Sequence, residues 1–384
     1  MKKVTYIKVN HEVLKWARES IVLSRAKAAE NTSISVKRLE QLEDGEKQPS
    51  LDELKALSKE YKRTIATLLL KQPPKEKPLP KDRRTVNSKE LDHFHEKTIM
   101  AVRKARALAT ALIELKEETG QPLTQFQYKA SFEDSPSLIA QELRAKWALD
   151  EVRQLGSMND VLEAYIEKVE SLGVAVFQLS LTQDNLRGFS IVDEQVPIIV
   201  IKKGGEQTTS KIFTLFHELG HLLLNEGGIC DITFDTGAQK IEMWCNAFAA
   251  ELLIPSKELL GMKLVKERKA TKEKEWPKKE LIELANYFHV GPLAILRCLL
   301  EHNLTTPAFY KEKHAAWNKP SFGRAKNPEG INIPKEAIKE RGRNYIRLAF
   351  KAFDQNKIDL KDLSDFLGVK LSYIPKTRQL LNAS

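Results

Sequence analysis

The sequence has few cysteines and no long apolar run. Its three cysteines, Cys230, Cys245 and Cys298, have no regular spacing. A small and odd number argues against a disulfide framework and fits a reducing cytoplasm. No segment approaches the roughly 18 consecutive apolar residues that a membrane-spanning helix needs. The N-terminus is basic but lacks the apolar stretch and small-residue cleavage site of a signal peptide. We therefore expect a cytoplasmic protein with no membrane partner.

Acidic charge is scarce at both ends of the chain. Residues 1–90 contain 21 Lys and Arg against 13 Asp and Glu, and residues 310–384 contain 16 against 8. The net charge of the whole chain is +10, so the middle is acidic. Basic ends are typical of nucleic-acid contact, although an ordinary solvated surface would give the same count.

The hydrophobic pattern predicts a multidomain fold. Hydrophobic residues make up 42% of the 384 residues, which is enough for packed cores. Helical spacing predicts an all-α N-terminal part, with helices at 11–19, 24–30, 35–43, 51–60 and 64–70. Four prolines then lie among charges at 72–84, which predicts an extended linker because proline cannot continue a helix.

The middle of the chain has an α+β pattern. Further helices are predicted at 89–118, 137–148, 158–171, 208–224, 239–253 and 278–302. Between them, β-branched and aromatic residues predict a small sheet with strands at 174–179, 186–192 and 197–201. The Lys/Glu-rich stretch 266–280 is interpreted as a solvated loop. A second segment rich in Pro and Gly, at 318–334, separates a C-terminal helical block.

The segment LSRAKAAENTSISVKRLEQLE at 23–43 predicts two helices joined by a short turn. Ala28 and Ala29 allow close helix packing, and Ser35 is placed to cap the second helix. Together with DGEKQPSLDEL, this segment resembles the Xre/Cro/C1-type helix-turn-helix family over residues 11–70. It departs from the family at Thr32 and Ser33, where an apolar residue and Gly are usual.

This resemblance implies transcription regulation through double-stranded operator DNA. The second helix would lie in the major groove, where Arg, Lys and Gln contact base edges or phosphates. The resemblance places the DNA-binding residues at the starts of the two helices: Ser24 and Arg25 on the first, and Ser35, Lys37, Arg38 and Gln41 on the second. A helix-turn-helix that has become a protein-interaction module is the alternative.

The pentapeptide His217-Glu218-Leu219-Gly220-His221 lies in an apolar helical segment. Two histidines four residues apart share one helical face and can present two imidazoles to one metal ion. Glu218 can accept a proton from a metal-activated water and deliver it to a leaving amine. The alternative is two hydrogen-bonded histidines on a buried helix.

A third metal ligand is predicted in the next helix. Glu242 begins this helix 21 residues after His221, and would complete a His2Glu site that leaves a fourth position for water. Asn246, one turn later, is placed to orient an imidazole. Glu251 is the weaker candidate, and a helix-surface role for Glu242 is the alternative.

Residues 172–300 resemble the ImmA/IrrE family of metallopeptidases. The resemblance rests on a strand before the metal helix, on FTLFHELGHLLL, on the E-x-x-x-N-x-F-A-A-E-L-L-I-P stretch and on LANYFHVGPLAILRCLL. It implies a zincin-like metallopeptidase domain in which His217, His221 and Glu242 hold Zn2+ and Glu218 is the general base. It also implies a protein substrate, typically a helix-turn-helix repressor, and we expect the strand near 197–202 to pair with it by edge addition.

The sequence therefore predicts a DNA-binding regulator that is also a zinc metallo-endopeptidase, a hydrolase. The rival is a non-catalytic regulator or antitoxin, from a toxin–antitoxin or mobile-element system, whose peptidase-like domain binds a partner. The C-terminal block could be a second helix-turn-helix unit or a packing or oligomerisation element, and a homodimer is left open. The predicted parts are a helix-turn-helix domain at 1–71, a linker at 72–88, a helical connection at 89–170, the peptidase domain at 171–305 and a helical region at 306–384.

Overall fold

The computed structural model describes residues 5–77, 79–82, 96–181, 186–229, 240–317 and 332–383. The chain divides into two compact units, one formed by Met1–Leu79 with Ser88–Arg103 and the other by Pro80–Asn87 with Lys104–Ser384. Among the described residues, no helix combines the length and apolar character needed to cross a membrane. Cys230 lies outside the described residues, and Cys245 and Cys298 are buried.

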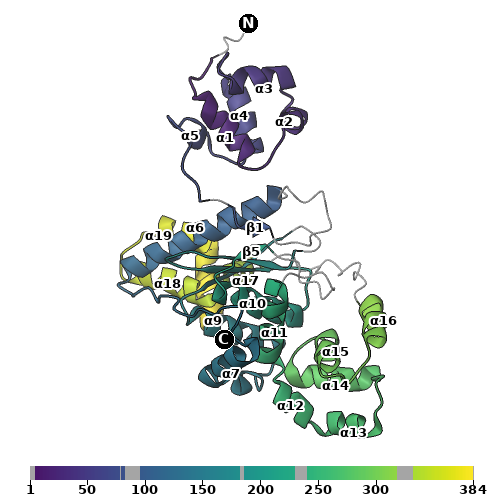
Figure 1. Ribbon diagram of the computed structural model, residues 1–384. Helices are drawn as coiled ribbons and strands as arrows, with labels where there is room; N and C mark the ends of the chain where they lie inside the picture. The colour runs from purple at the N-terminus through teal and green to yellow at the C-terminus, as the bar shows by residue number, and fades with distance from the viewer. Residues whose placement is uncertain are drawn as a thin grey trace. The chain divides into compact units, whose positions relative to one another are not determined.

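The described residues before position 78 form short helices, as the sequence predicts (Figure 1). These are α1 (His11–Glu19), α2 (Arg25–Thr32), α3 (Val36–Glu43), α4 (Leu51–Glu60) and α5 (Ile65–Leu68). Each helix begins at a side-chain oxygen that accepts a hydrogen bond from a backbone N–H of the first turn, on Asn10, Ser24, Ser35, Ser50 and Thr64. Their apolar faces share one core, which includes Leu14, Ala28, Leu39, Leu54 and Leu57.

The turn between α2 and α3 explains how the chain accommodates Ser33 where glycine is usual. Ser33 has φ of 60°, in the left-handed region, and ends α2. This conformation costs a residue with a Cβ about 1 kcal/mol, which the packing of the two helices offsets. Ser35 then caps α3 by accepting a hydrogen bond from Arg38 N at 3.2 Å. The predicted pair of helices joined by a short turn is confirmed.

A buried carboxylate holds these helices together. Glu43 accepts hydrogen bonds from Arg18 Nε at 2.7 Å, Arg25 Nε at 2.8 Å and the Tyr61 hydroxyl at 3.2 Å. Burial alone would raise the pKa of Glu43, but the two guanidinium groups lower it on balance. Glu43 is therefore ionised in the folded state, and its carboxylate links α1, α2 and α3 to the end of α4.

We expect the ion pair between Arg38 and Glu53 to persist in acid. Arg38 donates to both Glu53 oxygens, at 2.8 and 2.9 Å, and the Ser50 N–H donates at 2.7 Å. The Arg38 hydrogen bonds, with help from Ser50, lower the pKa of Glu53 from 4.5 to about 2. Because the folded-state pKa is the lower one, the stabilisation is complete above about pH 4.5 and is lost as the pH falls toward 2.

The measurement is a 13C titration of the Glu53 carboxyl carbon in the full chain. The pair is partly exposed, so we expect it to contribute only about 1 kcal/mol. In an Arg38→Gln variant the carboxyl should titrate closer to the ordinary value for glutamate, because only the Ser50 hydrogen bonds remain to lower its pKa. A wild-type Glu53 that titrates at that ordinary value would contradict the ion pair.

The second unit contains one mixed sheet. Its strands are β1 (Lys81–Asp82), β2 (Ala175–Leu179), β3 (Gly188–Ile191), β4 (Ile198–Lys202) and β5 (Gly228–Ile229), in the order β1-β5-β3-β4-β2. β4 pairs in parallel with β2 and antiparallel with β3. The three predicted strands are confirmed, and β1 falls inside the segment predicted as a linker.

The strand order corrects one expectation. β4 was expected to bind an extended substrate along a free edge, but both of its edges carry hydrogen bonds to neighbouring strands. That expectation is wrong because a strand's pairing partners are set by tertiary topology, which its own hydrophobic pattern does not encode. In the described residues the outer strands are β1 and β2.

Helices make up most of the second unit. They are α6 (Glu96–Glu118), which starts in the first unit, α7 (Pro136–Trp147), α8 (Leu149–Val152), α9 (Met158–Glu170), α10 (Thr208–Leu223), α11 (Lys240–Leu253), α12 (Ser256–Gly261), α13 (Lys263–Thr271), α14 (Lys278–Phe288), α15 (Pro292–Glu301), α16 (Pro307–Trp317), α17 (Ile333–Arg341), α18 (Arg343–Asp354), α19 (Leu360–Leu367), η1 (Leu371–Tyr373) and α20 (Ile374–Asn382). The α+β character predicted for the middle of the chain is confirmed.

Two helical predictions need correction. The helix predicted at 278–302 is two helices, because His289 adopts a left-handed φ of 55° and Pro292 starts the next helix. Of the loop predicted at 266–280, the residues up to Thr271 belong to α13 and those from Lys278 on belong to α14. Arg268 of α13 pairs with Glu280 of α14 at 2.7 Å. Charged composition indicated exposure there, but exposure does not exclude a helix.

The sheet is covered on both faces. Val176, Ile199 and Ile201 belong to the same core as the apolar face of α10. Neighbouring residues of a strand point to opposite faces, and Phe177 accordingly contacts Tyr345 of α18 with 6.5 Å between ring centroids. The C-terminal block therefore packs on the sheet, which favours the packing role over a separate second helix-turn-helix unit.

Candidate metal centre

The helices α10 and α11 approach closely at Gly220. A Cβ on Gly220 would lie 3.1 Å from the Cα of Cys245 and 3.2 Å from its Cβ and Sγ. The absence of a side chain on Gly220 therefore lets α11 contact α10 directly. This contact brings Glu242, at the first turn of α11, to the face of α10 that carries the two histidines.

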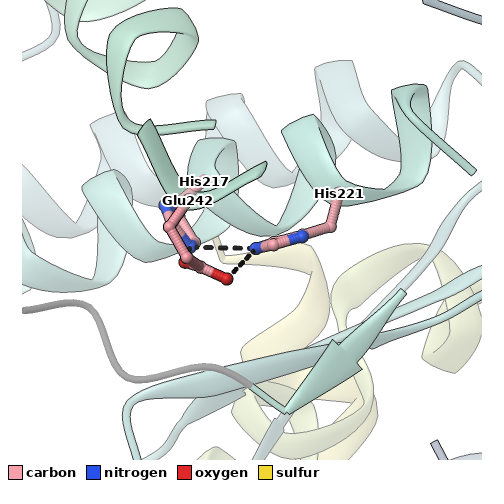
Figure 2. Close-up of side chains that lie close together, drawn as sticks. All are labelled: His217, His221 and Glu242. Carbon is pink, nitrogen blue, oxygen red and sulfur yellow. Dashed lines mark hydrogen bonds and ion pairs between the residues drawn. The ribbon is translucent and has the colours of Figure 1, made fainter. Parts of the chain in front are cut away.

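The three predicted metal ligands lie together (Figure 2). The Nε2 atoms of His217 and His221 are 3.1 Å apart. The Glu242 carboxylate places Oε2 3.2 Å from His217 Nε2 and Oε1 3.4 Å from His221 Nε2. One ligand atom from each residue falls within 4.8 Å of the others, and all three residues are buried. Among the described residues this is the one such group of histidine, cysteine and acidic side chains.

These spacings fit a tetrahedral zinc ion. Zinc binds imidazole nitrogen and carboxylate oxygen at about 2.0–2.2 Å, so two ligand atoms of a tetrahedral site lie roughly 3.3 Å apart. The separations of 3.1, 3.2 and 3.4 Å match that value. Two nitrogens and one oxygen are also the donor set of a catalytic zinc site, which keeps its fourth position open.

Charge and hydrogen bonding hold the ligands in place. Burial would raise the pKa of Glu242, but the two imidazoles lower it on balance, so the carboxylate stays ionised. Burial would lower the pKa of His217, but Glu242 raises it on balance. Asn246 Oδ1 lies 2.9 Å from His217 Nδ1, one turn of α11 beyond Glu242. That contact leaves His217 Nε2 to face the other two ligands.

Glu218 is buried beside this cluster without being part of it. Its side chain is fully buried, and neither carboxylate oxygen has a hydrogen-bond partner of good geometry among the described residues. Burial raises the pKa of Glu218 to about 8, and the His217 imidazole and the Ser190 hydroxyl offset only part of that effect. A buried acid with a pKa near neutrality is suited to accept and release a proton.

The strand β3 shapes the space around Glu218. A Cβ on Gly188 would lie 2.5 Å from Thr214 Cγ2 and 3.4 Å from Glu218 Cγ. Ser190, two residues on and therefore on the same face, has a buried hydroxyl. The sequence reasoning missed both residues. The available signal was the pair of small residues at alternate positions of a strand that is otherwise apolar.

We expect Gly220→Ala to weaken both the fold and the metal centre. The added methyl group meets the backbone of α11, so the two helices must separate. Overpacking of this kind costs about 1–3 kcal/mol of unfolding free energy. Denaturant unfolding and zinc titration measure the two effects. Gly261→Ala is the control, because a Cβ there meets nothing within 4 Å, and equal stability of the two variants would contradict the close approach.

The weaker ligand candidate from the sequence, Glu251, lies elsewhere. It accepts hydrogen bonds from Gln141 Nε2 at 3.1 Å and Ser256 Oγ at 2.6 Å, so its carboxylate joins helices. Glu251 does not belong to the cluster of ligand atoms.

The structure also places the six residues predicted to contact DNA. Ser24 and Ser35 are helix caps, and their hydroxyls accept from backbone N–H groups at 3.2 Å. Arg25 is paired with Glu43 and Asp44, and Arg38 with Glu53. Lys37 is exposed on α3, and Gln41, one turn later, is half-buried. Lys37 and Gln41 are thus the predicted contacts whose side chains are not used as caps or in ion pairs.

Comparison with known proteins supports part of this picture. Residues 169–299 match the model of the IrrE N-terminal-like domain, in the M78 peptidase family. The match contains His217, Glu218, His221, Glu242 and Asn246, together with strands β2 to β5. It leaves the helices α1 to α9 outside, apart from the last residues of α9. No curated protein matches the chain.

Proposed function

We propose that this chain is a zinc-dependent metallo-endopeptidase that regulates transcription by cleaving a repressor-type protein. The observation that carries the catalytic part is the spacing of 3.1 to 3.4 Å between the two imidazole Nε2 atoms and the Glu242 carboxylate oxygens, beside the buried Glu218. The M78 peptidase match over the same residues supports it independently.

The residues of the site divide the chemistry between them. His217, His221 and Glu242 would hold the zinc ion, with Asn246 fixing the orientation of the first imidazole. Zinc in such a site supplies a Lewis acid that lowers the pKa of water and polarises a carbonyl group. Glu218, in its ionised form, would take the proton of the attacking water and deliver it to the amine of the departing peptide, and the raised pKa makes this carboxylate a stronger base. Glu218 is fully buried, which keeps bulk water away from this carboxylate.

Cleavage of a peptide library by the full-length protein tests the catalytic part. We expect defined cleavage sites by mass spectrometry, loss of cleavage with a zinc chelator and recovery on adding zinc. A library that stays intact at full zinc occupancy would favour the alternative, a regulator or antitoxin whose peptidase-like domain binds a partner. In cells, unchanged reporter output from a Glu218→Gln chain would favour the same alternative.

The helices α2 and α3 would form the DNA-binding part. Their short turn, the capped start of α3 and the exposed Lys37 are compatible with a helix in the major groove. Selection of bound duplexes from a random DNA library tests this part. We expect an enriched operator sequence, and we expect Lys37→Ala to weaken binding and reduce its salt dependence. Recovery of no duplex would reject DNA binding and leave the protein-interaction role for these helices.

A further inference from the structure

The second unit contains a cavity that none of the metal-centre residues lines. Its volume is about 410 Å³, and it lies between α6, the end of α9, β2 and α18. Most of its wall is apolar and includes Leu112, Leu123, Val174, Val176, Tyr345 and Leu348. Cavities of this size with a few polar groups are typical of small-molecule sites.

The backbone of β2 offers hydrogen bonds to this cavity. Ala175 N–H donates to Pro197 O, and Lys203 N–H donates to Leu179 O, both at 2.8 Å. Along a strand, the N–H and C=O groups of neighbouring residues point to opposite sides. Those of Ala175 and Leu179 point to β4, so those of Val174 and Val176 point away from it. No strand among the described residues pairs with β2 on that side. Both residues line the cavity, where their N–H and C=O groups are available to a ligand.

The cavity also has more positive than negative charge. Two of its cations are already paired, because Arg347 lies 3.3 Å from Glu167 and Arg341 lies 2.8 Å from Glu340. Lys116 and Lys351 line the cavity too. Neither lysine side chain has a hydrogen bond or ion pair within the described part of the chain. These two ammonium groups are therefore the cations of the wall that form no ion pair among the described residues.

The remaining carboxyl group does not neutralise them. Glu170 accepts a hydrogen bond from Asn344 Nδ2 at 2.6 Å. Burial raises the pKa of Glu170 to about 8, which Asn344 and Lys116 offset only in part. Near neutral pH this group is mostly protonated, so it can donate a hydrogen bond to an oxygen of a ligand. Burial also lowers the pKa of Lys116, and the charge of Glu170 offsets only part of that effect.

We propose that this cavity binds a small organic anion, namely a carboxylate with an apolar body. The carboxylate would face Lys116 and Lys351, with the Glu170 carboxyl and the β2 backbone as further hydrogen-bonding groups. The apolar body would lie against Phe177, Tyr345 and Leu348. Because the wall combines α6, β2 and α18, a bound anion would hold the C-terminal block against the sheet. This proposal does not depend on the metal centre or on peptidase activity.

Calorimetric titration of the full-length protein with octanoate tests the proposal. We expect octanoate to bind the wild type and raise its melting temperature, whereas the neutral octanamide should bind much more weakly. Lys116→Met should weaken octanoate binding on the order of 10- to 100-fold, the value of one hydrogen bond to a charged group. Leu348→Trp, which fills the cavity, should abolish binding.

Two controls keep the test decisive. Lys361→Met removes an exposed lysine of α19 outside the cavity and should leave octanoate binding unchanged. Octyl phosphate in place of octanoate shows whether the preferred head group is a carboxylate or a phosphate, and a clear preference for phosphate would overturn the choice of carboxylate. No octanoate binding to the wild type, equal binding of octanamide, or undiminished binding by a folded Lys116→Met protein would overturn the site itself.

Discussion

Replacing Glu242 by Ala is expected to reduce zinc affinity on the order of 100-fold or more. The substitution removes both carboxylate oxygens, of which Oε2 lies 3.2 Å from His217 Nε2 and Oε1 lies 3.4 Å from His221 Nε2. Losing even an outer partner of a zinc ligand costs about 10- to 100-fold in affinity, and a direct ligand should cost at least as much. Zinc titration of metal-free protein, followed by metal analysis, measures the effect.

Glu251→Gln provides the matched control for that experiment. Glu251 is also a buried carboxyl group on α11, but its hydrogen bonds go to Gln141 and Ser256. The glutamine side chain introduced at this position keeps an acceptor oxygen, so this variant should fold and bind zinc as the wild type does. Unchanged zinc affinity in Glu242→Ala, or equal losses in both variants, would remove Glu242 from the ligand set.

Replacing Glu218 by Gln is expected to lower kcat for peptide cleavage by about 10²- to 10⁴-fold, the usual contribution of a general acid–base group. Zinc content should stay at the wild-type level, because the Glu218 oxygens are not in the cluster of ligand atoms. Stability should not fall, since the change removes a buried carboxyl group without a good hydrogen-bond partner. Single-turnover kinetics with a peptide found in the library screen measures the rate.

The control here is Glu206→Gln, which changes a carboxylate that lies 3.9 Å from Arg187 and Lys202 and away from the metal cluster. It should cleave at the wild-type rate. If the Glu218→Gln protein retained zinc and full kcat, Glu218 could not be the proton carrier. If it lost zinc as well as activity, its role would be structural.

The grouping of the predicted metal ligands could be foreseen from the sequence because helical geometry fixes their spacing. His217 and His221 share a face in any α-helix, and Glu242 and Asn246 share a face of the next one. The structure brings all four together. Two helices with a short turn at the start of the chain were predictable for the same reason, since Ser24 and Ser35 mark where each helix begins.

What the sequence could not predict depends on contacts between distant segments. The interior position of β4 is set by its pairing with β2 and β3, which the pattern of β4 itself does not encode. Gly188 leaves space for the Glu218 side chain only because β3 packs against α10, and the sequence does not encode that contact. The ion pairs of Arg25 with Glu43 and of Arg38 with Glu53 also join separate segments, and the contact of these two arginines with DNA stays a prediction.

The most direct test of the metal centre is a crystal structure of the zinc-loaded protein with anomalous data at the zinc edge. We predict one strong peak at bonding distance from His217 Nε2, His221 Nε2 and a Glu242 oxygen, with a solvent molecule in the fourth position. A zinc peak bound by other side chains, or none at these three, would contradict the account.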